Sequence, residues 1–205
     1  MPDQPPKSPW DDRYASPDYF FGTTPNDFLV AASPRLLPGE TLCLADGEGR
    51  NGVSLARLGH QVTSIDASQV GLQKAQVLAG ENNVTLNTEV ADLLTYDLGN
   101  NRWDNIISIF FHLPTQQRQA MHQRITAALK PGGRLVLEAY TPAQLLMKTG
   151  GPADADWLMT STTLQEDFAG LTFLYILEQE RDVIEGTGHT GRAAVVQLIA
   201  EKPSA

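Results

Sequence analysis

The chain has 205 residues, of which 41% are hydrophobic and 19% are charged, and its formal net charge is -9 at pH 7. These proportions are typical of a globular protein with a buried core, and the length suits a single α/β domain. Clustered Lys and Arg side chains are what hold a phosphate backbone, so the acidic balance argues against a nucleic-acid partner.

The chain begins with a polar, proline-rich stretch over residues 1–9, which predicts a disordered tail. This stretch lacks the apolar segment of a secretory signal, and no later run is long enough to span a bilayer. We therefore predict a cytoplasmic protein without a membrane partner. The one cysteine, Cys43, lies in an apolar run typical of a packed strand. No His/Cys cluster has metal-ligand spacing, so no metal is expected.

Strand-like and helix-like segments alternate between residues 41 and 140, the pattern of a parallel sheet with helices on its faces. We expect a helix after Ser68, a good N-cap, with Val70, Ala75, Leu78 and Ala79 on its inner face. The strands are predicted at 41–45, 61–65, 84–90, 105–111 and 134–140, and the other helices at 53–58 and around 121–129, the last one stopped by the KPGG run at 130–133.

The C-terminal third of the chain has a different pattern. Residues 141–167 carry proline, two adjacent glycines and acidic side chains, which predicts an excursion over one edge of the sheet. Two β-prone runs follow at 172–184 and 193–201. The EGTG sequence at 185–188 favours an antiparallel hairpin between them.

A glycine-rich turn follows the first predicted strand, where residues 42–52 read LCLADGEGRNG. Gly47 and Gly49 permit positive φ and a close approach of a ligand to the backbone. The spacing of Gly47, Gly49 and Gly52 also satisfies the dinucleotide fingerprint, and Asp66 ends the second strand where that fingerprint expects its ribose-binding acid. The glycine pattern alone therefore indicates a nucleoside cofactor without selecting one.

Charge at the turn favours S-adenosylmethionine over a dinucleotide. A pyrophosphate bound there would face Asp46 and Glu48, with Arg50 as the one compensating base in the turn. S-adenosylmethionine has no phosphate and carries an ammonium and a sulfonium, so acidic side chains suit it. Asp66 would accept hydrogen bonds from the ribose hydroxyls of either cofactor. Asp92, in the Ala91-Asp92-Leu93 segment after the third strand, is a candidate for the adenine amino group. The alternative for both aspartates is that they are ordinary turn carboxylates.

At these residues the chain resembles the class I S-adenosylmethionine-dependent methyltransferases over nearly its whole length. The first motif is the glycine turn, the second is SIDAS at 64–68 and the third is LKPGGRL at 129–135. The leader, with WDDRY at 10–14 and FGTTPNDFL at 21–29, together with FFHLP at 110–114, is similar to the tellurite-resistance and thiopurine-methyltransferase-like branch.

The resemblance implies a Rossmann-like, doubly wound sheet of seven strands, mostly parallel, with an antiparallel C-terminal strand. It implies a single methyltransferase domain over residues 10–205, with a leader or lid at 10–40, a nucleoside-binding core at 41–140, and the excursion and hairpin at 141–205. The residues expected to bind the cofactor are Tyr14, Phe20 and Gly22 of the leader, Asp46, Gly47, Glu48, Gly49, Asn51, Asp66, Ala67, Ser68, Ala91, Asp92 and Leu93 of the core loops, and Phe110 after the fourth strand.

The methyl acceptor is expected to be a small molecule, because the acidic charge argues against a nucleic acid. Base methylation loses further ground because the FHLP sequence at 111–114 replaces the Asn/Asp-Pro-Pro-aromatic motif with which nucleic-acid amino-methyltransferases hold an amine. His112 is a candidate general base, although it can equally cap the next helix or bind substrate. Tyr19 and Tyr140 are candidates for an apolar substrate wall. The segment 148–151 and His189 are further candidates for the substrate rim, with surface loop as the alternative.

The sequence thus predicts in-line methyl transfer from S-adenosylmethionine, with S-adenosylhomocysteine as the product, by a monomer or homodimer. Two other functions stay open. One is an NAD(P)-dependent oxidoreductase, which the glycine spacing and Asp66 also fit. The other is a non-catalytic protein that binds S-adenosylmethionine or docks a partner. A further alternative keeps the methyl transfer but has protein or RNA as the acceptor, against which the acidic charge and the absence of a basic stripe argue.

Overall fold

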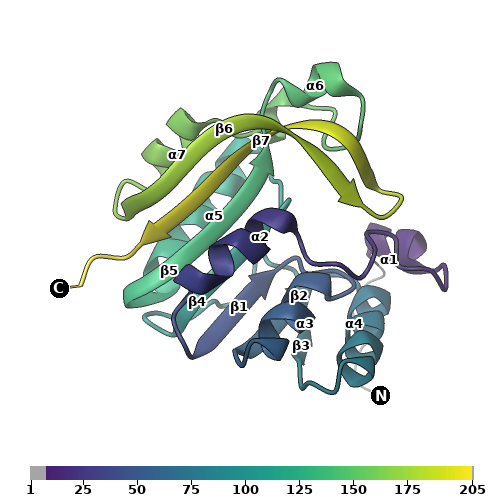
Figure 1. Ribbon diagram of the computed structural model, residues 1–205. Coiled ribbons are helices and arrows are strands. Elements are labelled where there is room, and N and C mark those ends of the chain that lie inside the picture. The colour runs from purple at the N-terminus through teal and green to yellow at the C-terminus, as the bar shows by residue number, and fades with distance from the viewer. Residues whose placement is uncertain (1–7, 205) are drawn as a thin grey trace.

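A computed structural model describes residues 8–204 of the chain. Seven strands form one sheet in the order β3-β2-β1-β4-β5-β7-β6, in which β1 to β5 run parallel and β7 runs antiparallel to both of its neighbours (Figure 1). This topology confirms the predicted fold class. The strands are β1 (Glu40–Leu44), β2 (Gln61–Asp66), β3 (Asn87–Val90), β4 (Trp103–Ile109), β5 (Leu129–Tyr140), β6 (Thr172–Glu185) and β7 (His189–Glu201).

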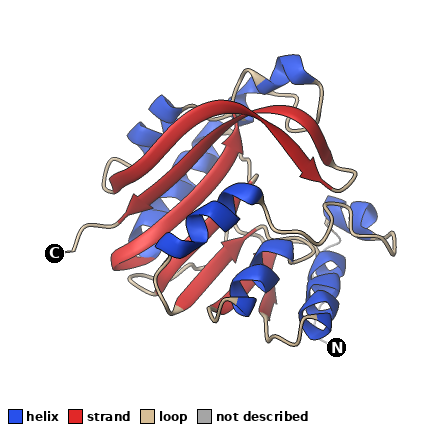
Figure 2. Cartoon of the chain, in the orientation of Figure 1, coloured by secondary structure: helices blue, strands red, loops and turns tan. Residues whose placement is uncertain are grey.

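Helices cover both faces of the sheet (Figure 2). One hydrophobic cluster joins α5 and α7 to one face through residues such as Met121, Ile125 and Phe168. The other joins α2, α3 and α4 to the opposite face through residues such as Leu29 and Leu55. The helices are α1 (Pro9–Tyr14), α2 (Asp27–Ala32), α3 (Arg50–Arg57), α4 (Gln69–Glu81), α5 (Thr115–Ala128), α6 (Gln144–Met147) and α7 (Ser161–Asp167), with short 3-10 turns at η1 (Ser33–Arg35) and η2 (Ala155–Trp157).

The predicted boundaries hold where local signals are strong. Ser68 caps α4 by accepting a hydrogen bond from the Gly71 amide at 3.0 Å, and Ala75, Leu78 and Ala79 are buried as predicted, whereas Val70 is half-buried. The KPGG run does end α5, at Ala128, but the structure makes it the irregular start of β5.

Several boundaries differ from prediction, among them the start of β3 at Asn87 rather than residue 84 and the start of α5 at Thr115 rather than near residue 121. Helix α3 begins at Arg50 rather than residue 53, because Gly49 with a φ of 85° turns the chain directly into the helix. Strand β7 begins at His189 rather than residue 193, so the hairpin closes immediately after the EGTG turn. Of the predicted disordered tail, residues 1–7 lie outside the described residues. Ser8 and Pro9 instead start α1, because Ser8 and Asp11 form a capping box.

The tip of the β6–β7 hairpin reaches over the sheet to the leader, as Figure 1 shows. The Phe20 carbonyl accepts hydrogen bonds from the amides of Thr187 at 2.9 Å and Gly188 at 3.2 Å. Gly186 packs so closely that a Cβ atom there would lie 2.3 Å from the Phe20 carbonyl oxygen. The leader and the hairpin tip therefore meet above the carboxyl ends of the parallel strands. Across the described residues, the helices are all too short or too polar to cross a membrane.

Candidate functional site

A cavity of about 710 Å³ lies at the carboxyl ends of the parallel strands, between the leader and the hairpin. This volume is within the usual range of small-molecule and cofactor pockets, about 300–1,000 Å³. Its wall is formed by Trp10, Arg13, Tyr14, Phe21, Ala45, Asp46, Gly47, Arg50, Asn51, Asp66, Ala67, Ala91, Asp92, Leu93, Leu94, Ile109, Phe110, Phe111, His112, Leu113, Tyr140, Gly150, Gly151, Pro152, Trp157, Gly188 and His189.

Asp66 ends β2 in the wall of this cavity, with its side chain buried. Its Oδ2 accepts from the Gly47 amide at 2.9 Å and its Oδ1 accepts from the Ser68 amide at 2.8 Å. Burial raises the pKa of Asp66, although the two amide hydrogen bonds oppose that effect. A carboxylate has about four acceptor positions, so Asp66 can accept further hydrogen bonds from a ligand.

The glycine turn places backbone directly against the cavity. Gly47 has a φ of 56°, and a Cβ atom there would lie 2.6 Å from the Tyr14 hydroxyl oxygen. Gly49 lines no part of the cavity, and its missing side chain instead admits Ala75 of α4 at close range. Of the two glycines, Gly47 faces the cavity and Gly49 serves packing.

Asp46 lines the cavity, but its carboxylate also serves the fold. It accepts from the Ser64 hydroxyl at 2.6 Å and from the Gly52 amide at 3.2 Å. Burial raises the pKa of Asp46 to about 7, against the opposing effect of these hydrogen bonds. The Gly52 amide belongs to the first turn of α3, the place where a dinucleotide fold presents amides to a pyrophosphate. Here Asp46 already occupies that amide.

Glu48 does not line the cavity, which corrects the prediction that it faces the cofactor. Its Oε2 accepts from the amides of Phe20 at 2.8 Å and Phe21 at 3.4 Å, and its other oxygen pairs with Lys74 of α4. The prediction treated Glu48 as uncompensated because Lys74 lies 26 residues further along the chain. Glu48 is instead the anchor that holds the leader.

Asp92 stands in the cavity wall on an exposed turn. Its Oδ1 accepts from the Leu94 amide at 2.9 Å, so it is also a turn carboxylate as the alternative supposed. Ala91 and Leu93 beside it line the same part of the wall, as does Ala67 after Asp66. The predicted nucleoside residues are therefore gathered beside β2 and β3.

The leader contributes less to the wall than predicted. Tyr14 lines the cavity and stacks on Trp10, whereas Phe20 and Gly22 contact the hairpin instead. Tyr19 points to α4, where its hydroxyl donates to the Lys74 carbonyl at 3.1 Å, so it is not part of the wall. Ser68 also lies outside the wall as the cap of α4, and its hydroxyl donates to Asp11 of α1.

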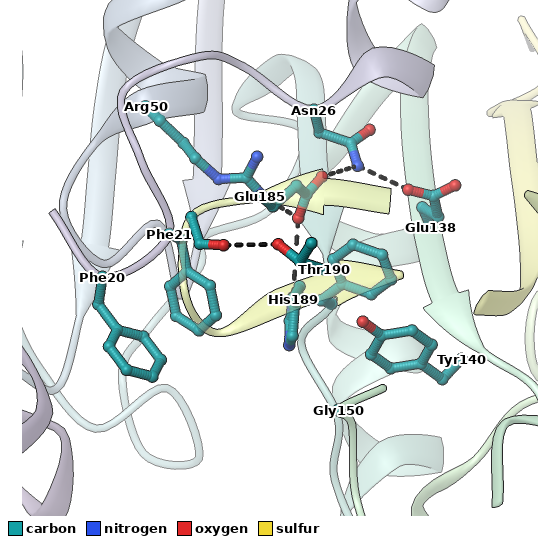
Figure 3. Close-up of polar contacts among 12 residues, drawn as sticks. Phe20, Phe21, Asn26, Arg50, Glu138, Tyr140, Gly150, Glu185, His189 and Thr190 are labelled. Carbon is teal, nitrogen blue, oxygen red and sulfur yellow. Dashed lines mark hydrogen bonds and ion pairs between the residues drawn. The ribbon is translucent and has the colours of Figure 1, made fainter. Parts of the chain in front are cut away.

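Asn51 lines the cavity, but the oxygen of its side chain accepts from the Asn26 amide at 3.0 Å. Because this oxygen already accepts a hydrogen bond within the protein, it is not the part of Asn51 that would bind a ligand. Asn26 in turn donates through Nδ2 to Glu138 at 2.6 Å and to Glu185 at 2.8 Å, as Figure 3 shows. Arg50 joins the same buried network through Glu185 at 2.6 Å.

His112 lines the cavity without a free basic nitrogen, which contradicts its prediction as the general base. Its Nδ1 donates to the Phe110 carbonyl at 2.9 Å, and its Nε2 accepts from the Tyr140 amide at 3.0 Å. A carbonyl only accepts and an amide only donates, so the ring is held neutral with both nitrogens used. Burial also lowers the pKa of His112 to about 4.

An aromatic group forms the end of the cavity beside β4 and β5. The Phe110 and Tyr140 rings stack with centroids 4.5 Å apart, and His112 stacks on Tyr140 at 5.6 Å. The Tyr140 hydroxyl is buried and has no hydrogen-bond partner among the described residues. Burial raises the pKa of Tyr140, so the hydroxyl remains a donor. Tyr140 thus lies in the cavity wall, and its contact with a substrate stays a prediction.

Several wall residues were missed or underrated from the sequence. Trp10 and Arg13 belong to the WDDRY motif of the leader but were not named as site residues, and Trp157 lies in no motif; all three line the cavity. Gly150, Gly151 and His189 were candidates for the rim and do lie in the wall. Among the described residues there is no group of three or more side chains positioned to hold a metal ion.

Residues 42–133 match a family described as a methyltransferase domain, which is a little under half of the 205 residues. The matched part runs from β1 into β5 and includes the glycine turn, Asp66 and Asp92. Comparison with curated protein sequences gives no significant match.

Three solved structures with a similar fold are 19–20% identical to this chain. One, from a study of the conversion of a disulfide bond into a thioacetal group during echinomycin biosynthesis, has 20% identity and a TM-score of 0.76 over 95% of this chain and 90% of that chain. TehB from Haemophilus influenzae has 19% identity and a TM-score of 0.71 over 94% of this chain and 65% of its own.

A third similar structure is magnesium protoporphyrin IX methyltransferase from Synechocystis PCC 6803 with bound S-adenosylmethionine. It has 20% identity and a TM-score of 0.62 over 85% of this chain and 74% of its own. Residues 42–133 therefore match the methyltransferase domain family by sequence, and the chain has the fold of the class I methyltransferases.

Proposed function

We propose that the cavity binds S-adenosylmethionine and that the protein transfers the methyl group to a small molecule. The observation that carries this proposal is the Asp66 carboxylate, buried in the cavity wall beside the Gly47 backbone and free to accept from the hydroxyls of a ribose. The methyltransferase-domain match over residues 42–133 supports it.

The residues present fit this cofactor better than a dinucleotide. Asp46 occupies the Gly52 amide in the first turn of α3, so this amide is not open to a pyrophosphate. Two cations near the turn are already paired with carboxylates, since Arg50 pairs with Glu185 and Lys74 pairs with Glu48, whereas Arg13 of the cavity wall lies over the Trp10 ring. With a pKa of about 7, Asp46 repels a phosphate less than a fully ionised acid would, so occupation of the amide is the stronger reason.

In the proposed complex, Asp66 binds the ribose and the Asp92 turn borders the adenine. S-adenosylmethionine supplies a methyl group on a positively charged sulfur, already activated for displacement. Most of what the chain must then do is align the acceptor and exclude water. The stacked rings of Phe110 and Tyr140, with Phe21 and Trp157, provide an apolar wall for that purpose.

A small acceptor is favoured because the wall combines enclosure with aromatic side chains. The cavity lies beneath the leader and the hairpin, which are joined by the hydrogen bonds from Thr187 and Gly188 to the Phe20 carbonyl. These contacts narrow the access of a macromolecule to the cavity. The net charge of -9 also disfavours a nucleic-acid substrate. An aromatic or otherwise apolar molecule of modest size suits this wall.

Calorimetric titration with S-adenosylmethionine, S-adenosylhomocysteine, NADH and NADPH tests the proposed function. We expect the two sulfur nucleosides alone to bind, and Asp66→Ala to weaken them about 10- to 150-fold, the equivalent of losing a hydrogen bond to a charged group worth about 1.5–3 kcal/mol. Asp97→Ala is the matched control, because Asp97 also accepts from a turn amide but lies outside the cavity. Binding of a nicotinamide cofactor alone would replace the proposal with the oxidoreductase alternative.

A further inference from the structure

His189 is the first residue of β7 and lines the cavity beside the aromatic wall. It is the direct cross-strand partner of Glu185, the last residue of β6. Its Nδ1 lies 3.6 Å from Glu185 Oε2 and has no hydrogen-bond partner within the described part of the chain. Catalytic hydrogen bonds are often this long before the ligands bind. The hairpin therefore aims one nitrogen of His189 at a carboxylate.

Glu185 is fixed and charged. Its side chain is buried and accepts from Arg50 Nη2 at 2.6 Å and from Asn26 Nδ2 at 2.8 Å (Figure 3). Burial alone would raise the pKa of Glu185, but His189, Arg50 and Asn26 outweigh it and hold the pKa at about 2. An ionised carboxylate only accepts hydrogen bonds, so it favours the form of His189 that carries its proton on Nδ1.

The opposite nitrogen, Nε2, has no hydrogen-bond partner among residues 8–204 and lies on the side of the ring away from Glu185. Three aromatic rings of the wall hold the imidazole, with centroids 4.7 Å away for Phe21, 5.0 Å for Phe110 and 5.3 Å for Tyr140. Figure 3 shows the ring below the hairpin strand, between Phe21 and Tyr140. His189 thus differs from His112, in which both nitrogens are bonded to backbone.

His189 lies at the end of the cavity opposite the residues expected to bind the nucleoside. The strand order sets β2 and β3 at one side of β1, and β4, β5 and β7 at the other. Asp66 and Asp92 follow β2 and β3, whereas Phe110, Tyr140 and His189 belong to β4, β5 and β7. With the nucleoside at the first side, the acceptor must occupy the second, beside His189.

We propose that His189 is the catalytic base of the methyl transfer, and that the acceptor is accordingly a hydroxyl or thiol that is protonated at neutral pH. This inference rests on the proposed function. The acceptor's X–H proton moves to Nε2 of His189 while the X–H electron pair forms the new bond to the methyl carbon. The sulfur keeps the electron pair of the broken S–C bond, and Glu185 stabilises the imidazolium until water removes its proton.

A pair of thiols that differ in acidity tests this role. Phenylmethanethiol is protonated near neutral pH and needs a base, whereas 4-nitrobenzenethiol is already a thiolate and does not. We expect His189→Gln to slow methylation of phenylmethanethiol by about 10²- to 10⁴-fold, the usual contribution of a general base, and to spare 4-nitrobenzenethiol. The readout is formation of S-adenosylhomocysteine. His60→Gln is the matched control, because His60 is half-buried and lies outside the cavity wall.

Equal loss with both thiols, or no loss with phenylmethanethiol, would overturn the assignment. A wild-type protein that methylates the thiolate alone would overturn it as well, because a base in the wall has a purpose only for a protonated acceptor.

A second readout does not depend on turnover. ¹⁵N NMR of the imidazole rings, assigned with His189→Gln, reports which nitrogen carries the proton when S-adenosylhomocysteine is bound at mildly alkaline pH. We expect the proton of His189 on Nδ1, and a proton on Nε2 would overturn the inference while leaving the proposed function intact. Failure of S-adenosylhomocysteine to bind at all would instead remove the proposed function, and the inference with it.

Discussion

The end of the cavity beside Asp66 and the end beside His189 are built in different ways. The first is made of short loops that directly follow β1, β2 and β3, and Asp66 is fixed by amides at most 19 residues away. The second brings together the leader, the end of β5 and the hairpin, so that Asn26 contacts Glu185 across 159 residues. The first end is a local property of the chain, whereas the second exists only when distant segments close.

Asn26→Ala should affect the second end most, and we expect the largest loss of stability from it. The substitution removes hydrogen bonds to Glu138 and Glu185 and leaves both buried carboxylates short of a donor. The cost should be about 3–5 kcal/mol in the free energy of unfolding, measured by urea denaturation. Asn82→Ala, which removes a single hydrogen bond from the half-buried end of α4 to the Leu78 carbonyl, is the control and should cost far less. Equal effects of the two substitutions would contradict the role given to the network.

Asp46→Asn tests the end of the cavity beside Asp66 through the pH dependence of the free energy of unfolding. The folded pKa of Asp46 is about 7, above its ordinary value of 3.8, so ionisation destabilises the folded state. Its contribution is fully present below about pH 4 and is lost as pH rises to about 7. Relative to Asp46→Asn, the wild type should therefore lose up to roughly 4 kcal/mol across that window, at about 1.4 kcal/mol per pKa unit.

Urea denaturation of both proteins at several pH values measures this difference. A constant difference between pH 4 and 7 would show that Asp46 titrates normally in the folded protein.

Gly186→Ala probes the closure of hairpin on leader. Gly186 has a φ of 59°, and a Cβ atom there would lie 2.3 Å from the Phe20 carbonyl oxygen. We expect a loss of about 2 kcal/mol in the free energy of unfolding, from the backbone conformation and the clash. Gly80→Ala is the control, because a Cβ atom at that helical position meets nothing within 4 Å. It should stabilise the protein by about 0.5–1 kcal/mol. If both glycines tolerate alanine, the hairpin does not close as described.

Tyr140→Phe should have the smallest effect on folding. The Tyr140 hydroxyl is buried without a partner in the described chain, so its removal breaks no internal hydrogen bond. We expect the free energy of unfolding, measured by urea denaturation, to change by less than about 0.5 kcal/mol. Phe keeps the stacking with Phe110. A loss above about 1 kcal/mol, the usual worth of a hydrogen bond, would mean that the hydroxyl has a structural partner after all.

The same difference between local and distant construction explains what the sequence revealed. The positions of Asp66, Gly47 and the Ser68 cap were predictable because each follows directly from the end of one strand, and their roles toward a cofactor stay predictions. The fold class followed from the alternation of strands and helices. Glu48 was misread because Lys74, its partner, comes from α4, beyond the helix that follows the turn. His112 was misread because the Tyr140 amide that binds its Nε2 lies 28 residues away.

His189 was underrated for a more specific reason. The second strand of the hairpin was placed from residue 193, whereas β7 begins at His189 and pairs it with Glu185. A glutamate and a histidine flanking a three-residue glycine-containing turn was a usable signal, since residues in these positions face each other when the turn is tight. Trp157 had no such signal, because nothing near it in the sequence specifies the cavity that it reaches.

Calorimetric titration of S-adenosylhomocysteine into Asp66→Ala and His189→Gln, side by side with the wild type, tests the division of the cavity most directly. If the nucleoside occupies the first end and the acceptor the second, Asp66→Ala weakens binding at least about tenfold, as expected for the loss of a charged hydrogen bond, and His189→Gln binds as the wild type does. Equal weakening by the two substitutions, or no weakening by Asp66→Ala, would contradict that division.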